Sequence, residues 1–254
     1  MPAEVQVDVD DGVMVVTVNR PRARNAITQP VAEAIAAAFD ELDACGELMA
    51  AVLTGAGGTF CSGRDLKAAR AGDHPWVARR GFAGMVEYGS AKPLIAAVEG
   101  YALGGGFEIV LACDLVVSAA SARFGLPEVR RGRIAGAGGL LRLPRRVPYH
   151  IATELALTGE PMTAERAAHF GLVNRLTADG RALEEAVALA RQIAENGPLA
   201  VAATKRVIVE SADWDSGEAF ARQGEVIRPV FTSADAIEGA TAFAQKRAPV
   251  WRGE

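Results

Sequence analysis

The stretch Tyr101–Leu115, YALGGGFEIVLACDL, places Glu108 in an otherwise apolar run that directly follows three glycines. The apolar residues from Phe107 to about Cys113 predict a helix that begins at the glycine turn. An isolated carboxylate among apolar side chains costs several kcal/mol or takes up a proton. Glu108 therefore needs a partner, access to water or a chemical role.

Short strands, glycine turns and helices alternate through the first half of the chain. The predicted elements are a hairpin of strands at 5–9 and 13–18 turning at Asp11-Gly12, a helix capped by Thr28 and ended by Gly46, strands at 51–54, 93–98 and 115–117, and the helix from 107. This order indicates an α/β fold with parallel strands. After position 140 the helical patterns at 147–157, 163–170, 181–196, 198–211 and 233–246 predict a helical appendage rather than more sheet.

The composition is that of an ordinary globular protein. Of 254 residues, 50% are hydrophobic and 23% are charged, which is enough for one domain or a body with an appendage. The formal net charge of −4 argues against nucleic acid or an anionic membrane surface as a partner. The acidic, alternating start MPAEVQVDVDDG does not resemble a signal peptide, and no apolar run reaches the roughly 20 residues of a membrane span. We expect a cytoplasmic protein.

Neither the cysteines nor the histidines have metal-ligand spacing. Cys45, Cys61 and Cys113 form no spaced pair, so a disulfide framework or a zinc site is not expected. Cys61 lies beside a glycine turn, but no histidine stands in a recognisable relation to it, and packing is the favoured interpretation. We expect no metal.

The glycines fit no nucleotide motif. The sequence contains neither G-x-x-x-x-G-K-[ST] nor G-x-S-x-G, and Gly55-Ala-Gly57 lacks the third glycine of a dinucleotide fingerprint. The turns Ser62-Gly63-Arg64 and Gly104-Gly105-Gly106 could instead face one another and offer two backbone N–H groups to one oxygen, as an oxyanion hole does. Tight turns without a chemical role remain the alternative.

A second glutamate, Glu128, follows Glu108 by 20 residues in the sequence FGLPE. A segment of that length can form one helix and one strand and so bring the chain back to the same end of a parallel sheet. Two carboxylates beside an oxyanion hole suit the addition or removal of water, since one can deprotonate the water while the other exchanges a proton on carbon. Taken alone, Glu128 could equally be an acid at a helix start.

These motifs together resemble the crotonase, or enoyl-CoA hydratase/isomerase, superfamily. The resemblance rests on NRPRARNAI (19–27), LTGAGGTFCSGRDLK (53–67), the run from Lys92 to Val129, GAGGLLRLPR (136–145) and DAIEGATAFAQKRAPVW (235–251). It implies a crotonase-type spiral of ββα units over residues 1–195, a C-terminal helical region over 196–254, and assembly as a homotrimer or a dimer of trimers. It also implies that the N–H groups of Arg64 and Gly105 form the oxyanion hole and that Glu108 and Glu128 are the catalytic acids.

The resemblance further implies an acyl-CoA thioester as substrate, with no cofactor beyond the CoA that belongs to it. The CoA would pass Arg22-Ala23-Arg24 and Lys67, with Phe243 and Lys246 near its nucleotide end. The remaining binding residues that the family pattern implies are Gly63, Asp65, Leu66, Gly104 and Gly136. Arginine and lysine suit phosphates by charge, although a solvated surface cation is as common a reason for each.

Within the family the sequence resembles carnitinyl-CoA dehydratases most, through GRDLKAARAG, RGFAG, GGLLRLPRRVP and DAIEGATAFAQKRAPVWRG. Arg64 departs from the small or apolar residue that is commoner at its position, and Ala135 from a frequent proline. If the substrate were crotonobetainyl-CoA, its trimethylammonium group would need an aromatic face or a carboxylate. The local candidates are Trp76, Phe82, Glu87 and Tyr88.

The expected activity is the reversible addition of water to a 2-enoyl-CoA. Hydration of crotonobetainyl-CoA, isomerisation of an enoyl-CoA with Glu128 alone moving protons, and a non-catalytic acyl-CoA-binding scaffold are the alternatives. The presence of both glutamates favours hydration. The basic run that includes Arg131 and Arg133 is interpreted as a solvated or subunit-contact face, and Trp214 and Trp251 as packing or interface residues.

Overall fold

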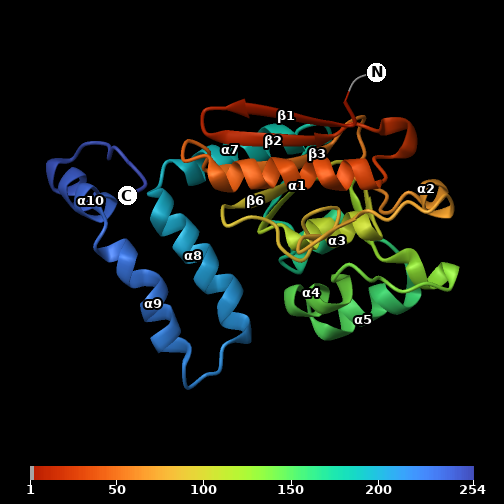
Figure 1. Ribbon diagram of the computed structural model, residues 1–254. Coiled ribbons are helices and arrows are strands. Elements are labelled where there is room, and N and C mark those ends of the chain that lie inside the picture. Colours follow the sequence, from red (N-terminus) through yellow and green to blue (C-terminus); the bar gives the residue numbers. More distant parts are fainter. Residues whose placement is uncertain (1–2) are drawn as a thin grey trace.

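The computed structural model describes residues 3–254, so Met1 and Pro2 of the predicted N-terminal region lie outside the described residues. A six-stranded sheet forms the centre, in the order β1-β2-β3-β6-β8-β11 (Figure 1). Its strands are β1 (Val5–Asp10), β2 (Val13–Val18), β3 (Ala50–Gly55), β6 (Leu94–Val98), β8 (Leu115–Ala119) and β11 (Arg175–Thr177). The predicted hairpin is confirmed: β1 and β2 are antiparallel, and Asp11 and Gly12 both have positive φ. The other neighbours are parallel, as predicted.

Alternate residues of the central strands pack on opposite faces of this sheet. Leu53 belongs to the larger apolar core, which it shares with α1 (Gln29–Ala44) and α3 (Gly105–Ala112). Val52 belongs to a second core beneath α7 (Ala182–Ala194), where Ala186 and Ala190 are fully buried. Helices therefore cover both faces of the sheet, which is why the sequences of its central strands are almost entirely apolar.

A smaller sheet carries the segments that matter for function. It consists of β7 (Tyr101–Leu103), β9 (Arg123–Gly125) and β10 (Met162–Thr163), and Cys61 forms a parallel bridge to Ala102 of β7. The chain runs β6, β7, α3 and then β8, β9 and the 3₁₀ turn η2 (Pro127–Arg131). Each unit thus adds one strand to each sheet before a helical segment. This repeat confirms the ββα spiral.

Residues 66–90, which follow β3 and precede β6 in the chain, form short elements. They are α2 (Leu66–Arg70), β4 (Trp76–Val77) and β5 (Gly81–Phe82), with β4 and β5 paired as a hairpin. The Phe82 side chain is fully buried, and the Trp76 ring lies 5.1 Å from it, centroid to centroid. This hairpin brings two aromatic rings to the end of the small sheet.

The prediction of a helical appendage after position 140 is wrong for the first part of that region. Strand β11 joins the large sheet beside β8, β10 joins the small sheet, and α7 packs on the large sheet. Strands of two or three residues are too short to show a periodic pattern. The body also contains α4 (Gly139–Arg146), α5 (Tyr149–Thr158) and α6 (Ala164–His169).

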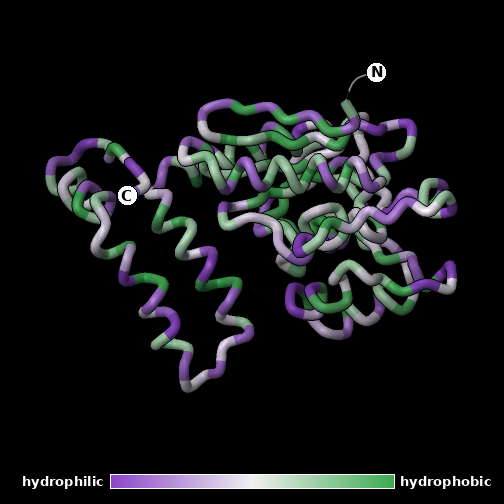
Figure 2. The backbone as a smooth tube through the Cα atoms, viewed as in Figure 1, coloured by the Kyte–Doolittle hydropathy of each residue, from purple (hydrophilic) through white to green (hydrophobic). Residues whose placement is uncertain are grey.

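The last three helices extend from the body as an arm (Figure 1). They are α8 (Pro198–Glu210), α9 (Ala219–Phe231) and α10 (Ala234–Gln245), with the turn η3 (Ser211–Asp213) between the first two. An ion pair of 2.6 Å between Lys205 and Asp114 ties α8 to the body. Hydrophobic residues recur along the arm (Figure 2), and Phe220 and Phe231 are 86% and 75% exposed. The division at 195/196 stays a prediction.

Among residues 3–254, no helix is long and apolar enough to cross a membrane. The same residues contain no cluster of three or more His, Cys, Asp or Glu side chains that could hold a metal ion.

Candidate active site

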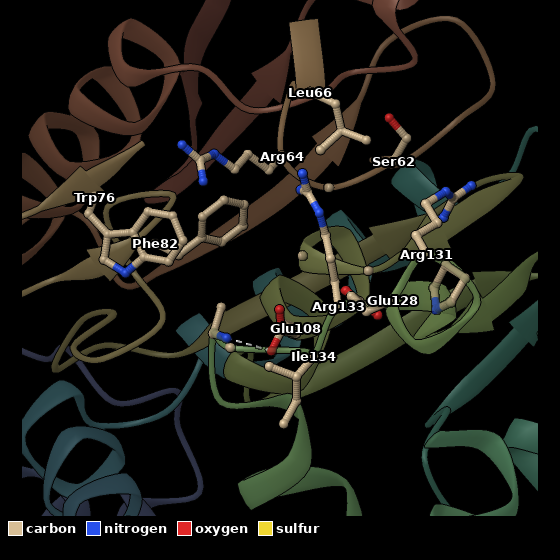
Figure 3. A pocket seen from close by; sticks show the side chains of 16 residues that line it. Ser62, Arg64, Leu66, Trp76, Phe82, Glu108, Glu128, Arg131, Arg133 and Ile134 are labelled. Atoms are coloured by element: carbon tan, nitrogen blue, oxygen red, sulfur yellow. Dashed lines mark hydrogen bonds between the residues drawn. The ribbon is translucent and has the colours of Figure 1, made fainter. Parts of the chain in front are cut away.

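Three turns meet at one end of the small sheet and line a cavity of about 420 Å³ (Figure 3). They follow neighbouring parallel segments: Ser62–Arg64 comes after the bridge at Cys61, Gly104–Gly105 after β7, and Pro127–Glu128 after β9. Because the carboxyl ends of parallel strands share one edge, the turns converge. The predicted return of the chain to Glu108 is therefore confirmed, although it occurs through β9 of the small sheet.

The two predicted oxyanion donors face this cavity. Ile27 donates its N–H to the Gly63 carbonyl (2.8 Å) and accepts from the Asp65 N–H (2.9 Å), so the intervening Arg64 N–H points to the opposite side. Gly105 is the first residue of α3, where N–H groups have no partner within the helix. A Cβ on Gly63 would lie 2.9 Å from the Gly105 nitrogen, which shows how closely the turns approach. Among residues 3–254 neither N–H has a hydrogen-bond partner, so both can donate to one ligand oxygen, with the positive end of α3 behind them.

Glycine is required where these turns touch. Gly104 has φ +56°, and a Cβ there would lie 2.8 Å from Oε1 of Glu128. A Cβ on Gly106 would lie 2.1 Å from the Cys61 carbonyl oxygen. A side chain at either position would displace a functional group, so these glycines maintain the distances in the site.

Glu108 is 3% exposed and lies at the start of α3. Its Oε1 accepts hydrogen bonds from the backbone N–H groups of Ala137 (2.7 Å) and Gly139 (2.9 Å). Burial raises the pKa of this carboxyl, and the two N–H groups and Arg142 oppose that rise. These partners fix the carboxylate in place and favour its ionised form. This is how the lone acid of the apolar run is accommodated.

Glu128 lies in η2 on the other side of the cavity and is held differently. Its Oε2 is buried and has no hydrogen-bond partner in the part of the chain that the structure describes. Burial raises the pKa of Glu128 and the negative charge of Glu108 adds to the rise, while a hydrogen bond from its own backbone N–H and the charge of Arg131 oppose it. The surroundings therefore favour the protonated form of Glu128. The pKa of Glu108 is raised as well, so the two carboxyls differ in their hydrogen bonds rather than in the direction of the shift.

The predicted CoA-binding residues fall into two groups near the cavity. Those that line it are Gly63, Leu66, Gly104 and Gly136, together with the four predicted catalytic residues Arg64, Gly105, Glu108 and Glu128. The segment 22–24, in and after η1 (Pro21–Ala23), lies alongside, because the Arg24 carbonyl accepts the Ser62 N–H (3.0 Å). Lys67 is exposed on α2 beside Leu66. These positions are compatible with a ligand that leaves the cavity past η1 and α2.

Asp65, which the motif suggested as a binding residue, has a structural role in this fold. Its carboxylate accepts from the N–H groups of Lys67 (3.0 Å) and Ala68 (3.1 Å) and so caps α2, and it pairs with Arg20 (3.1 Å). Although burial raises the pKa of Asp65, these hydrogen bonds lower it overall. Asp65 thus holds the turn that carries Arg64 and Leu66.

Phe243 and Lys246 are not brought to the cavity of their own chain. They lie at the end of α10, the far end of the arm, and the Phe243 side chain is 88% exposed (Figure 1). Their placement near the nucleotide end of CoA stays a prediction.

The cavity also contains residues that the motifs did not assign to it. Arg131 and Arg133, interpreted above as part of a solvated or subunit-contact face, line it, as do Ile134 and Ala137. Trp76 and Phe82, named only as candidates for holding a cation, also line it (Figure 3). No local pattern marks these residues, since tertiary packing alone brings them here. Cys61 is fully buried, and burial raises its pKa to about 12, so packing is its role.

A family model described as enoyl-CoA hydratase/isomerase matches residues 8–254. The chain belongs to that family. An enoyl-CoA hydratase from Mycobacterium marinum is 55% identical in sequence, with a TM-score of 0.97 and 99% of each chain covered. A carnitinyl-CoA hydratase from Mycobacterium avium is 45% identical, with a TM-score of 0.79 over 99% of each chain. The carnitinyl-CoA dehydratase of Salmonella typhi is 42% identical over 249 residues, 95% of each chain. These relatives confirm the family and the resemblance to carnitinyl-CoA dehydratases, although the enoyl-CoA hydratase of M. marinum is more similar in sequence than either carnitinyl-CoA relative.

Proposed function

We propose that the protein is a hydro-lyase that reversibly adds water to 2-enoyl-CoA thioesters. The observation that carries this proposal is that two glutamates face one cavity beside two backbone N–H groups: Glu108 accepts two backbone hydrogen bonds, whereas Oε2 of Glu128 has no partner among residues 3–254. The family and the activities in the names of its relatives agree with it.

In the hydration direction the thioester oxygen accepts hydrogen bonds from the N–H groups of Arg64 and Gly105. Water adds to the β-carbon and gives one proton to the Glu108 carboxylate, while the negative charge that develops moves onto the thioester oxygen. Glu128 transfers its proton to the α-carbon. Dehydration is the same sequence reversed. The thioester and the protein groups suffice for this chemistry, so we propose that no metal or redox cofactor takes part.

Isomerisation of a 3-enoyl-CoA to a 2-enoyl-CoA needs only one group that moves a proton between two carbons. Glu128 alone could do this, and Glu108 would then have no task. The two backbone N–H groups that hold Glu108 in the cavity favour hydration.

Hydration of crotonobetainyl-CoA is a second candidate, and the names of the carnitinyl-CoA relatives favour it. Of its predicted cation-binding residues, Trp76 and Phe82 line the cavity, whereas Glu87 and Tyr88 do not. A trimethylammonium group would therefore have aromatic faces but neither Glu87 nor Tyr88 as a partner.

The assembly and location are proposals with the same basis. The exposed aromatic side chains of the arm suit a contact with another copy, which supports a homotrimer or a dimer of trimers. In such an assembly the arm of one copy could approach the cavity of another copy, whereas it does not reach the cavity of its own chain. A cytoplasmic location agrees with the composition and with the three unpaired cysteines.

The test offers crotonyl-CoA, longer 2-enoyl-CoA thioesters and crotonobetainyl-CoA as substrates. Hydration is measured as the loss of absorbance of the conjugated enoyl thioester. Hydration of any of them, abolished by Glu108→Gln, supports the proposal. Isomerase activity without hydration of any thioester would overturn it.

A further inference from the structure

An arginine side chain lies in the wall of the cavity next to the place where the acyl group reacts. Arg64 presents its backbone N–H to the thioester oxygen, so its guanidinium lies within one side-chain length of the reacting carbons. Figure 3 shows this side chain on the same side of the cavity as Trp76 and Phe82. Its Cζ is 5.7 Å from the centre of the Trp76 ring.

The charge of this guanidinium is not neutralised by the protein. Arg64 forms no ion pair with any carboxylate among residues 3–254. One of its nitrogens donates to the backbone carbonyl of Asp73 (2.5 Å), whose carboxylate is engaged by the Gln29 N–H (3.0 Å). The Nε of Arg64 is buried and has no hydrogen-bond partner within the described chain. Nη1 also has no hydrogen-bond partner among the described residues, but unlike Nε it is not buried, so a ligand acceptor can reach the guanidinium there.

The same side chain interferes with a cationic ligand. A trimethylammonium group binds best over the face of an aromatic ring. Arg64 already lies over the face of Trp76 and would repel a second cation there. A carboxylate, in contrast, would gain a charge-assisted hydrogen bond from the guanidinium.

We propose that Arg64 determines substrate specificity by selecting 2-enoyl-CoA thioesters whose acyl chain carries a carboxylate shortly beyond the double bond. This inference rests on the proposed hydratase function and narrows its substrate class to mono-thioesters of short unsaturated dicarboxylic acids. Arg64 lines the same cavity as Glu108 and Glu128, so its guanidinium is within reach of the end of a short acyl chain that reacts there.

The experiment compares three 2-enoyl-CoA thioesters that differ only in the group on the γ-carbon: methyl, carboxylate or trimethylammonium. We expect kcat/KM for the carboxylate substrate to exceed that for the methyl substrate by roughly 10- to 100-fold. The trimethylammonium substrate should be the poorest of the three. In Arg64→Met the ratio of carboxylate to methyl should fall to about one or below, and Arg64→Lys should retain part of the preference.

Because Arg64 also supplies an oxyanion N–H, substitution can lower all rates together, but such a loss cancels in the ratio. Arg70→Met changes the net charge equally at an exposed site on α2 that does not line the cavity, and it should leave the ratio unchanged. Dissociation constants of the saturated analogues provide a readout without turnover and should show the same preference.

An equal ratio in wild type and Arg64→Met would overturn the inference and leave Arg64 as a packing residue between Asp73 and Trp76. A preference for the trimethylammonium substrate would overturn it as well. In both cases hydration of the methyl substrate would still uphold the proposed function. If neither these three thioesters nor the substrates that test the proposed function are hydrated, the proposed function fails. A carboxylate preference in binding that disappears in Arg64→Met would still support the selection by Arg64.

Discussion

Gly106→Ala tests the geometry of the oxyanion hole without removing a functional group. A Cβ at this position would lie 2.1 Å from the carbonyl oxygen and 2.7 Å from the carbonyl carbon of Cys61. Ordinary contacts of a Cβ begin at 3.4 Å, so the oxygen and the new methyl group must separate by about 1.3 Å. Both contacts are with backbone, so no side chain can rotate to relieve them. The turn that carries Arg64 and the helix that begins at Gly105 must therefore move apart.

This displacement should strongly reduce catalysis. Misplacement by about 1 Å can cost roughly 10²-fold, and loss of one oxyanion donor costs about 10²–10³-fold in kcat. The Cys61 carbonyl also accepts the Leu103 N–H (3.0 Å), so the variant should lose about 1–3 kcal/mol of stability through overpacking. We expect hydration of crotonyl-CoA by Gly106→Ala to fall by at least 10²-fold, measured by absorbance at a temperature where circular dichroism shows the variant folded.

The matched control is Gly46→Ala, since Gly46 is exposed and a Cβ there meets nothing within 4 Å. It should keep wild-type activity. A folded Gly106→Ala variant with wild-type kcat would refute the reasoning that contact between these two turns sets the distance between the oxyanion donors.

Three further predictions concern titration, stability and assembly. A plot of kcat/KM for hydration against pH should be bell-shaped, because Glu108 must be ionised and Glu128 protonated. A fall in kcat/KM that begins near the ordinary pKa of a carboxyl would contradict the raised pKa of Glu128. Because the pKa of Glu108 is raised in the folded protein, ionisation of this carboxyl lowers the free energy of unfolding. This loss of stability is absent below the pKa of the unfolded chain and is complete above the pKa of the folded protein. Glu108→Gln should therefore gain stability over wild type at neutral pH but not in acid, and urea titrations showing the reverse would contradict this. Light scattering should give about three or six times the 26.5 kDa chain mass, and a monomer would contradict the proposed contact through Phe220 and Phe231.

The candidate residues that line the cavity could be picked out because their sequence context is unusual. A lone acid in an apolar run, preceded by consecutive glycines, has few structural explanations, and this identified Glu108. The N-terminal hairpin was predictable for a similar reason, since Asp11-Gly12 between alternating valines is a strong local signal.

Other features depend on contacts between distant segments and could not be read locally. The N–H groups that hold Glu108 belong to Ala137 and Gly139, about thirty positions away in the chain. Strands β7 and β9, which position the turns of the site, have only three residues each. The sequence pattern did not predict helices α4 and α9, because each contains an internal proline, which normally breaks a helix.

The central claim is that Glu108 handles water while Glu128 exchanges the α-proton, and comparing two reactions in two variants tests it most directly. A positioned general acid or base contributes about 10²–10⁴-fold. Glu108→Gln should lower hydration of crotonyl-CoA by roughly that factor while α-proton exchange on a saturated acyl-CoA suffers less. Glu128→Gln should suppress both reactions, with binding of the thioester retained because the oxyanion donors are backbone groups. Full hydratase activity in Glu108→Gln would contradict the account and favour a mechanism in which Glu128 acts alone.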